Sequence, residues 1–84
     1  MNIEVRLFMH FRKYLPAGSQ EDKALINLDE SATIADLLHS LGVPDHEQKL
    51  LVINGVSLGT SGVDTLQVLR HKDVVMVFPP VSGG

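Results

Sequence analysis

The seven residues at the carboxyl end form the most distinctive segment of this 84-residue chain. In order, they are Phe78, Pro79, Pro80, Val81, Ser82, Gly83 and Gly84. Two consecutive prolines give a stiff, extended exit that cannot continue a sheet ladder. Two glycines have no side chains, so they can enter a narrow channel and carry the α-carboxylate into it. The spacing therefore predicts a slender arm that presents a carboxylate, the alternative being an ordinary frayed terminus.

Other reactive groups are scarce. The chain has no cysteine, which excludes disulfides, thiolate metal sites and cysteine nucleophiles on this chain. The four histidines have no ligand-like spacing, so we expect no metal site; they are His10, His39, His46 and His71. The glycines miss the phosphate-loop pattern, which also needs Lys followed by Ser or Thr. We therefore expect neither an enzyme nor a bound cofactor.

Charge and hydropathy exclude further classes of function. The formal net charge is −3 and the basic residues are scattered, whereas nucleic-acid binding needs a clustered cationic surface. The longest apolar run, residues 74–81, is interrupted by two prolines, so we expect no transmembrane helix. Charged residues at positions 4 and 6 do not fit a secretory signal. The length fits one small domain, expected in the cytoplasm.

Hydrophobic residues alternate along residues 3–12, which predicts a half-buried strand. The face expected to be buried carries Ile3, Val5, Leu7, Met9 and Phe11. The opposite face carries Glu4, Arg6, Phe8, His10 and Arg12, and we expect His10 there to be solvated. A loop at residues 16–20 leads to a second alternating segment, residues 24–28, so the two strands read as a hairpin.

The period then changes to that of an amphipathic helix. Its apolar positions follow the i, i+3, i+4, i+7 rule and are Ile34, Leu37, Leu38 and Leu41. Thr33 can cap the start with Asp36 three residues later. Gly42 suits the left-handed residue after the last turn, and Pro44 prevents the helix from resuming.

The remaining segments predict three more strands. Residues 50–53 form one, closed by the turn signal Asn54-Gly55, and a brief strand follows at 56–58. Residues 64–69 read as an irregular turn with Leu66 and Leu69 inward. Residues 74–78 are apolar on both faces, as expected for a central strand. The order predicts an α+β β-grasp fold, with a mixed sheet of four to five strands, one main helix across one face, a domain over residues 1–80 and a flexible tail over 81–84.

Three segments carry a resemblance to a known family: residues 5–8, residues 52–55 and residues 74–84. The sequence resembles the ThiS/MoaD family of ubiquitin-like sulfur carriers, and its last seven residues look like those of molybdopterin synthase small subunits (MoaD). Thiamine-type ThiS carriers usually lack the two prolines. One departure is the turn before the last strand, where many members have Asp-Gly-Asp and this chain has His71-Lys72-Asp73.

The resemblance implies chemistry at the last carbonyl. An ATP-dependent activating enzyme (MoeB-like) would convert Gly84 to an acyl-adenylate, and a sulfur donor would then leave a thiocarboxylate. The tail would enter a channel of the molybdopterin synthase large subunit (MoaE-like), within a heterotetramer, and donate sulfur for molybdenum cofactor synthesis. The residues bound in that channel would be Pro79, Pro80, Val81, Ser82 and Gly83.

Partner docking is expected on the outer face of the sheet. Phe8 and Phe78 would share that face with Met76, forming an exposed apolar patch beside the tail. In the family, aromatic residues matching Phe8 and Phe78 contact the partner, and Leu58 is a third candidate. The alternative is that these side chains are covered by a loop or belong to the core.

Two other functions stay open. A carrier of the same fold could serve thiamine synthesis, tRNA thiolation or protein modification through an isopeptide bond. A β-grasp interaction module, in which the tail does no chemistry, is the third possibility. The Pro79-Pro80 pair favours the molybdopterin type.

Overall fold

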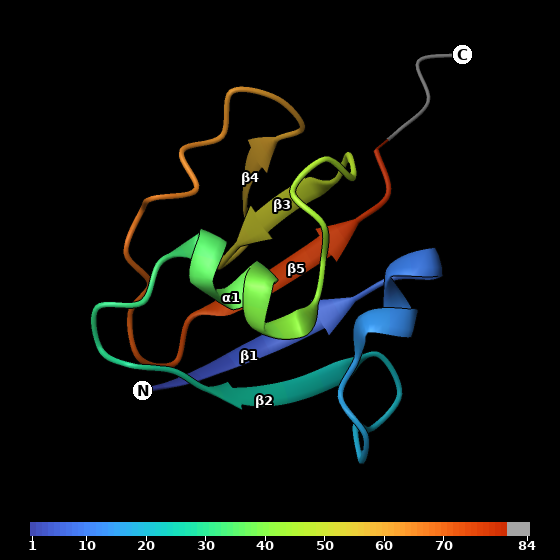
Figure 1. Ribbon diagram of the computed structural model, residues 1–84, viewed down its shortest axis with the longest axis vertical. Helices are drawn as coiled ribbons and strands as arrows, with labels where there is room; N and C mark the ends of the chain where they lie inside the picture. The colour runs from blue at the N-terminus through green and yellow to red at the C-terminus, as the bar shows by residue number, and fades with distance from the viewer. Residues whose placement is uncertain (81–84) are drawn as a thin grey trace.

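A five-stranded mixed sheet organises the protein. The computed structural model describes residues 1–80, so the expected tail at 81–84 lies outside the described residues and the domain boundary stays a prediction. The elements are β1 (Asn2–Leu7), the 3₁₀ helix η1 (Met9–Tyr14), β2 (Lys23–Asn27), α1 (Ile34–Leu41), β3 (Leu50–Ile53), β4 (Val56–Gly59) and β5 (Val74–Phe78). The sheet order is β2-β1-β5-β3-β4 (Figure 1). β5 pairs parallel with β1 and antiparallel with β3, which confirms the predicted central position.

The core lies between α1 and one face of the sheet. The four apolar positions of α1 are all buried, as predicted. Every second residue of β1 and β5 faces them, because side chains alternate along a strand. The strand residues in this core are Ile3, Val5, Leu7, Leu51, Ile53, Val75 and Val77. Figure 1 shows α1 crossing this face of the sheet; within residues 1–80 no helix lies over the other face.

Local signals at both ends of α1 act as predicted. The Thr33 side chain accepts a hydrogen bond from the Asp36 backbone N–H, and the Asp36 carboxylate accepts one from the Thr33 N–H. This capping box satisfies two backbone donors that have no partner within the helix. Gly42 adopts the left-handed conformation, with φ of 83°, and ends the helix.

The first strand is shorter than predicted. It ends at Leu7, and Met9 adopts a φ of 56°, which turns the chain into η1. Because of this turn, Met9 is 74% exposed, whereas Phe11 enters the core with no exposed surface. The apolar alternation of residues 3–12 therefore covers a strand followed by a short 3₁₀ helix, and the assignment of His10 and Arg12 to a strand face was wrong.

Residues 64–69 bury only one of the two expected leucines. Leu69 is buried and its N–H donates to the Ala32 carbonyl. Leu66 is 74% exposed, because its N–H donates to the Asp64 carboxylate in a local turn. The prediction that Leu66 faces inward was wrong.

The turn before β5, His71-Lys72-Asp73, contains no glycine. Lys72 takes the left-handed conformation there, with φ of 73°. The Asp73 carboxylate accepts hydrogen bonds from the Arg70 N–H and from the Asn54 side chain. The Asn54 side-chain oxygen accepts from the Val74 N–H. These bonds join the β3–β4 turn to the start of β5.

Candidate functional site

The uncovered face of the sheet carries a stacked aromatic pair. The Phe8 and Phe78 rings lie with centroids 4.4 Å apart and planes 4° from parallel. Met76 is on the same face, because Val75 and Val77 on either side of it are buried against α1. The structure thus brings the predicted trio Phe8, Met76 and Phe78 to one face, and their contact with a partner stays a prediction.

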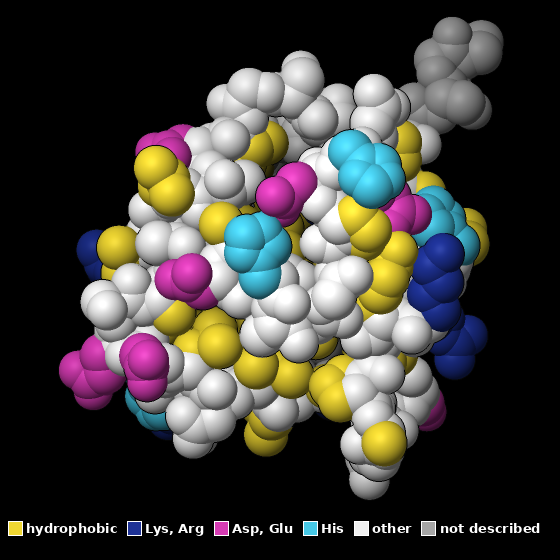
Figure 2. Space-filling view, in the orientation of Figure 1, with side chains coloured by type: hydrophobic (Ala, Val, Ile, Leu, Met, Phe, Trp, Pro, Cys, Tyr) yellow, Lys and Arg dark blue, Asp and Glu magenta, His cyan; other side chains and the backbone are white. Residues whose placement is uncertain are grey.

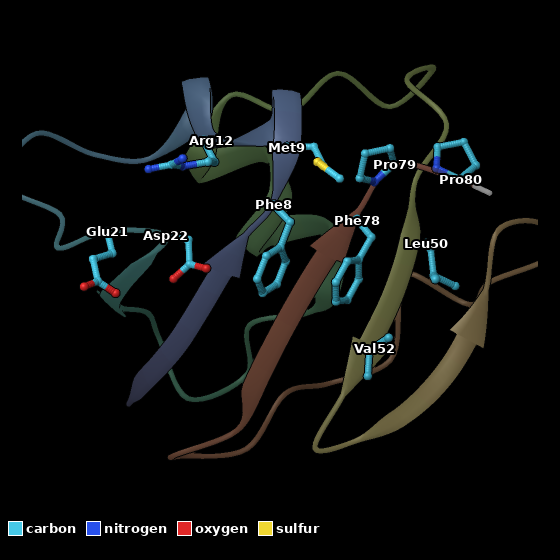
Figure 3. A pocket seen from close by; sticks show the side chains of 10 residues that line it. All are labelled: Phe8, Met9, Arg12, Glu21, Asp22, Leu50, Val52, Phe78, Pro79 and Pro80. Carbon is cyan, nitrogen blue, oxygen red and sulfur yellow. The ribbon is translucent and has the colours of Figure 1, made fainter. Parts of the chain in front are cut away.

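A wide hollow surrounds this aromatic pair. It has a volume of about 950 Å³, and we call it the Phe8–Phe78 groove. Its lining residues are Phe8, Met9, Arg12, Glu21, Asp22, Leu50, Val52, Phe78, Pro79 and Pro80. Figure 3 shows the two rings at its centre, with Leu50 and Val52 of β3 beyond Phe78. Leu50 is the cross-strand partner of Phe78, which explains their shared face.

Two of the predicted tail residues belong to this groove. Pro79 and Pro80 line it at the end of β5 (Figure 3). The prolines end the strand, since they have no N–H for a further ladder bond. The four other predicted tail residues lie outside the described residues; they are Val81, Ser82, Gly83 and Gly84.

Leu58 lies apart from the groove. It is on β4, where the pairing with β3 shifts register, and its half-buried side chain packs against the buried core. The structure therefore does not bring Leu58 together with Phe8 and Phe78, and its predicted contact with a partner is not tested.

Charged side chains form one rim of the groove. Arg12 comes from η1, and Glu21 and Asp22 come from the loop before β2. Within residues 1–80, none of the three makes an ion pair. No pattern in the sequence indicates this rim, because the alternation at residues 9–12 predicts a strand in place of η1 and the loop has no period. Leu50 and Val52 could have been found from the alternation along β3.

η1 is joined to the loop before β3 by a single carboxylate. The Tyr14 hydroxyl donates to Glu47 Oε1 at 2.5 Å, and His10 Nε2 lies 3.0 Å from Glu47 Oε2. The hydrogen bond from Tyr14 lowers the pKa of Glu47, with further lowering by His10 and Lys13. The bond to Glu47, and then burial, raise the pKa of Tyr14. This triad was not predicted; His10 is exposed, as expected, and its ring also contacts Glu47.

The helix-covered face has a different character. In Figure 2, hydrophobic, acidic and histidine side chains intermix there, and Lys and Arg gather at the edge occupied by η1 in Figure 1. Among residues 1–80, no three His, Asp or Glu side chains come together as a metal site would require. Over the same residues, no helix has the length and apolar character needed to cross a bilayer.

Comparison with known proteins places the chain in a family. The family model described as Mut7-C ubiquitin matches residues 1–82, which is nearly the whole sequence. No curated protein sequence matches the chain.

Solved structures share the same fold. The HVO 2177 protein of Haloferax volcanii is 28% identical with a TM-score of 0.74, over 100% of this chain and 87% of that one. A putative molybdopterin converting factor subunit 1 of Pyrococcus furiosus is 28% identical with a TM-score of 0.67, over 95% and 98%. SAMP1 of Haloferax volcanii is 24% identical with a TM-score of 0.70, over the full length of both chains, which shows the fold alone.

These matches confirm the resemblance inferred from the sequence at the level of fold and family. The chain has the ubiquitin-like β-grasp fold, with its helix on one face of a mixed sheet and an aromatic groove on the other. It belongs to the Mut7-C ubiquitin family.

Proposed function

We propose that the protein is a cytoplasmic sulfur carrier that acts as the small subunit of a molybdopterin synthase. In this role Gly84 is the terminal residue, and its carboxylate is converted to a thiocarboxylate that donates sulfur. The chain contributes the reactive end and a docking surface, and the large subunit contributes the catalytic side chains.

One observation carries this proposal. Pro79 and Pro80 lie in the wall of the Phe8–Phe78 groove, so the segment 81–84 begins at the edge of an apolar docking surface. The groove-facing side of the sheet is apolar at its centre and charged along one rim, which is the usual composition of a protein interface. A partner that covers the groove is therefore well placed to receive the residues that follow Pro80.

Sequence and comparison support the same role. The end of the chain, from Phe78 to Gly84, resembles that of molybdopterin synthase small subunits. The Pyrococcus furiosus protein of similar structure is named subunit 1 of a molybdopterin converting factor. From that name we infer that this chain also has a large-subunit partner, with which it forms a heterotetramer.

The proposed chemistry has two steps. The Gly84 carboxylate attacks the α-phosphorus of ATP on a separate activating enzyme, forming an acyl-adenylate and releasing pyrophosphate. A hydrosulfide equivalent then attacks the carbonyl carbon, so the C–S bond forms, the bond to AMP breaks and a thiocarboxylate remains. Activation is needed because a carboxylate is a poor acyl donor to a nucleophile at neutral pH.

A protein modifier is the second candidate function. SAMP1, which shares the fold, is named a small archaeal modifier protein. In that case the activated Gly84 carbonyl would be attacked by a lysine amine, forming an isopeptide bond. Other sulfur-transfer routes, to thiamine or tRNA, would use the same thiocarboxylate.

Intact mass spectrometry tests the proposal. The chain is incubated with an ATP-dependent activating enzyme, ATP and sulfide. A carrier that this enzyme is known to charge is treated in the same way as a control. We expect replacement of one oxygen by sulfur in this chain, and no change in a variant lacking Gly84. An unchanged mass beside a charged control carrier would contradict every carrier role.

A second assay separates the candidates. Charged protein is mixed with a molybdopterin synthase large subunit and the pterin precursor, and sulfur loss from the chain is followed. The molybdopterin role predicts that sulfur leaves only when both are present. A lysine adduct formed in place of sulfur transfer would favour the modifier.

A further inference from the structure

η1 forms one wall of the Phe8–Phe78 groove but has weak local support. It supplies Met9 and Arg12 to that wall. Its N-cap, Phe8, makes no side-chain capping bond, and its first turn has no acidic residue. A 3₁₀ helix has poorer hydrogen-bond geometry than an α-helix, so an isolated turn of this kind is marginal. Something outside η1 must therefore fix the position of this wall.

Two contacts can do so. Phe11 anchors one side of η1 in the core. On the other side, both oxygens of Glu47 are engaged, one by the Tyr14 hydroxyl and one by the His10 ring. Tyr14 and His10 lie four positions apart on η1, so one carboxylate contacts both ends of the short helix.

The loop that carries Glu47 is itself fixed. The Glu47 N–H donates to the Pro44 carbonyl, and Asp45 Oδ1 lies 2.8 Å from His39 Nε2 of α1. A continuous series of contacts thus runs from α1 through this loop to η1. Glu47 is the point where the series crosses from the loop to the groove wall.

We infer that Glu47 is a positioning residue that holds η1, and with it Met9 and Arg12, in the geometry needed for docking in the Phe8–Phe78 groove. The docking part of this inference rests on the proposed function, whereas the hold on η1 does not. Around Glu47, the titratable or charged groups are His10, Lys13 and Tyr14 on η1 and Asp45, His46 and Lys49 in its own loop. His10 adds an ion pair only when it is protonated.

A titration of Tyr14 tests the contact directly. Tyr14 is the single tyrosine and there is no tryptophan, so ultraviolet phenolate absorbance reports on this residue alone. We expect the phenol to titrate above 10.0 in the native chain and to move down toward that value in Glu47→Gln. Glu30→Gln is the matched control, because Glu30 is exposed and it carries the same change of charge. An identical titration in native protein and Glu47→Gln would overturn the inference.

Hydrogen exchange tests the hold on η1. The Phe11 and Leu15 amides are bonded within this turn, so they report its opening. In Glu47→Ala we expect them to exchange about three- to tenfold faster than in the native chain, with β5 amides unchanged. Glu47→Gln keeps an oxygen that can accept from Tyr14 and should restore most of the protection. Equal η1 protection in native protein and Glu47→Ala would contradict a positioning role.

Binding completes the test. Affinity for a molybdopterin synthase large subunit should fall at least threefold in Glu47→Ala, because docking needs η1 in its held position, and it should recover in Glu47→Gln. If η1 loosens and affinity does not change, the positioning role in docking is wrong. If native protein does not bind the large subunit at all, the proposed function fails, and titration and exchange still decide the hold on η1.

Discussion

The two faces of the sheet carry similar apolar residues but differ in how deeply these residues are buried. On β5, Val75 and Val77 have no exposed surface, whereas Val74, Met76 and Phe78 between and beside them are half-buried. α1 covers the first set, and within residues 1–80 no helix covers the second. A central strand that is apolar on both faces normally has cover on both. Under the proposed function, the covered face serves stability and the uncovered face serves docking to a partner.

Truncation on the covered face should have the largest effect on stability. Leu37→Ala removes a fully buried side chain of α1 and should lower the free energy of unfolding by about 3 kcal/mol. Chemical denaturation measures this loss. Met76→Ala on the uncovered face is the control, for which we expect about 1 kcal/mol or less. Equal losses would remove the distinction between the faces.

Truncation in the groove should reverse this pattern. Phe78→Ala breaks the stack with Phe8 and should weaken binding to the large subunit about tenfold or more, with a stability loss of only about 1–2 kcal/mol. Isothermal titration and denaturation give the two values. Leu25→Ala is a suitable control, because Leu25 is 73% exposed on β2 and does not line the groove. Unchanged affinity in Phe78→Ala would show that the groove is not the docking surface.

The triad at the edge of the two faces predicts a pH dependence. Its contacts lower the pKa of Glu47 below 4.5, so it contributes stability above its unfolded pKa that is lost as pH falls through the folded pKa. Tyr14 has a raised pKa, so its contribution is present below 10.0 and is lost as pH rises through the folded value. Glu47→Gln should therefore be less stable than the native chain near neutrality, and the gap should close in acid. A gap that is constant across denaturation curves from neutral to acidic pH would argue against the triad.

The smallest effect is expected from a change that touches neither face. Lys72 is exposed and holds a φ of 73°, which a residue with a Cβ adopts at some cost. Lys72→Gly should raise the free energy of unfolding by about 0.5 kcal/mol and leave binding unchanged. Lys72→Ala keeps the Cβ and should bring no gain. A loss of stability in Lys72→Gly, measured by denaturation, would show that the lysine side chain matters more than the turn.

The structure could be predicted from the sequence wherever a hydrophobic period or a local capping or turn signal determines it. The positions of Leu37 and Leu41, the cap at Thr33 and the turn at Asn54 all follow from neighbours within a few residues. The shared face of Phe8 and Phe78 followed from strand period and sheet order.

What was missed depends on contacts between distant residues. The left-handed φ at Met9 has no signal in its residue type, and apolar residues after it continued the alternation of β1. Glu47 meets Tyr14 across 33 positions, and neither lies in a periodic segment. Asp22 reaches the groove through a loop with no period. These features become visible only when the sheet brings the loops together.

The central place of β5 also determines when the protein can fold. β5 is the last of the five strands in chain order among residues 1–80, yet it is one of the two neighbours of both β1 and β3. During synthesis, which proceeds from the N-terminus, β1 and β3 must wait with unpaired edges until residues 74–78 have been made. Pairing of the first strand with the last has a high contact order, which slows folding relative to a helical protein of this size. A chain interrupted before residue 74 therefore cannot close its sheet.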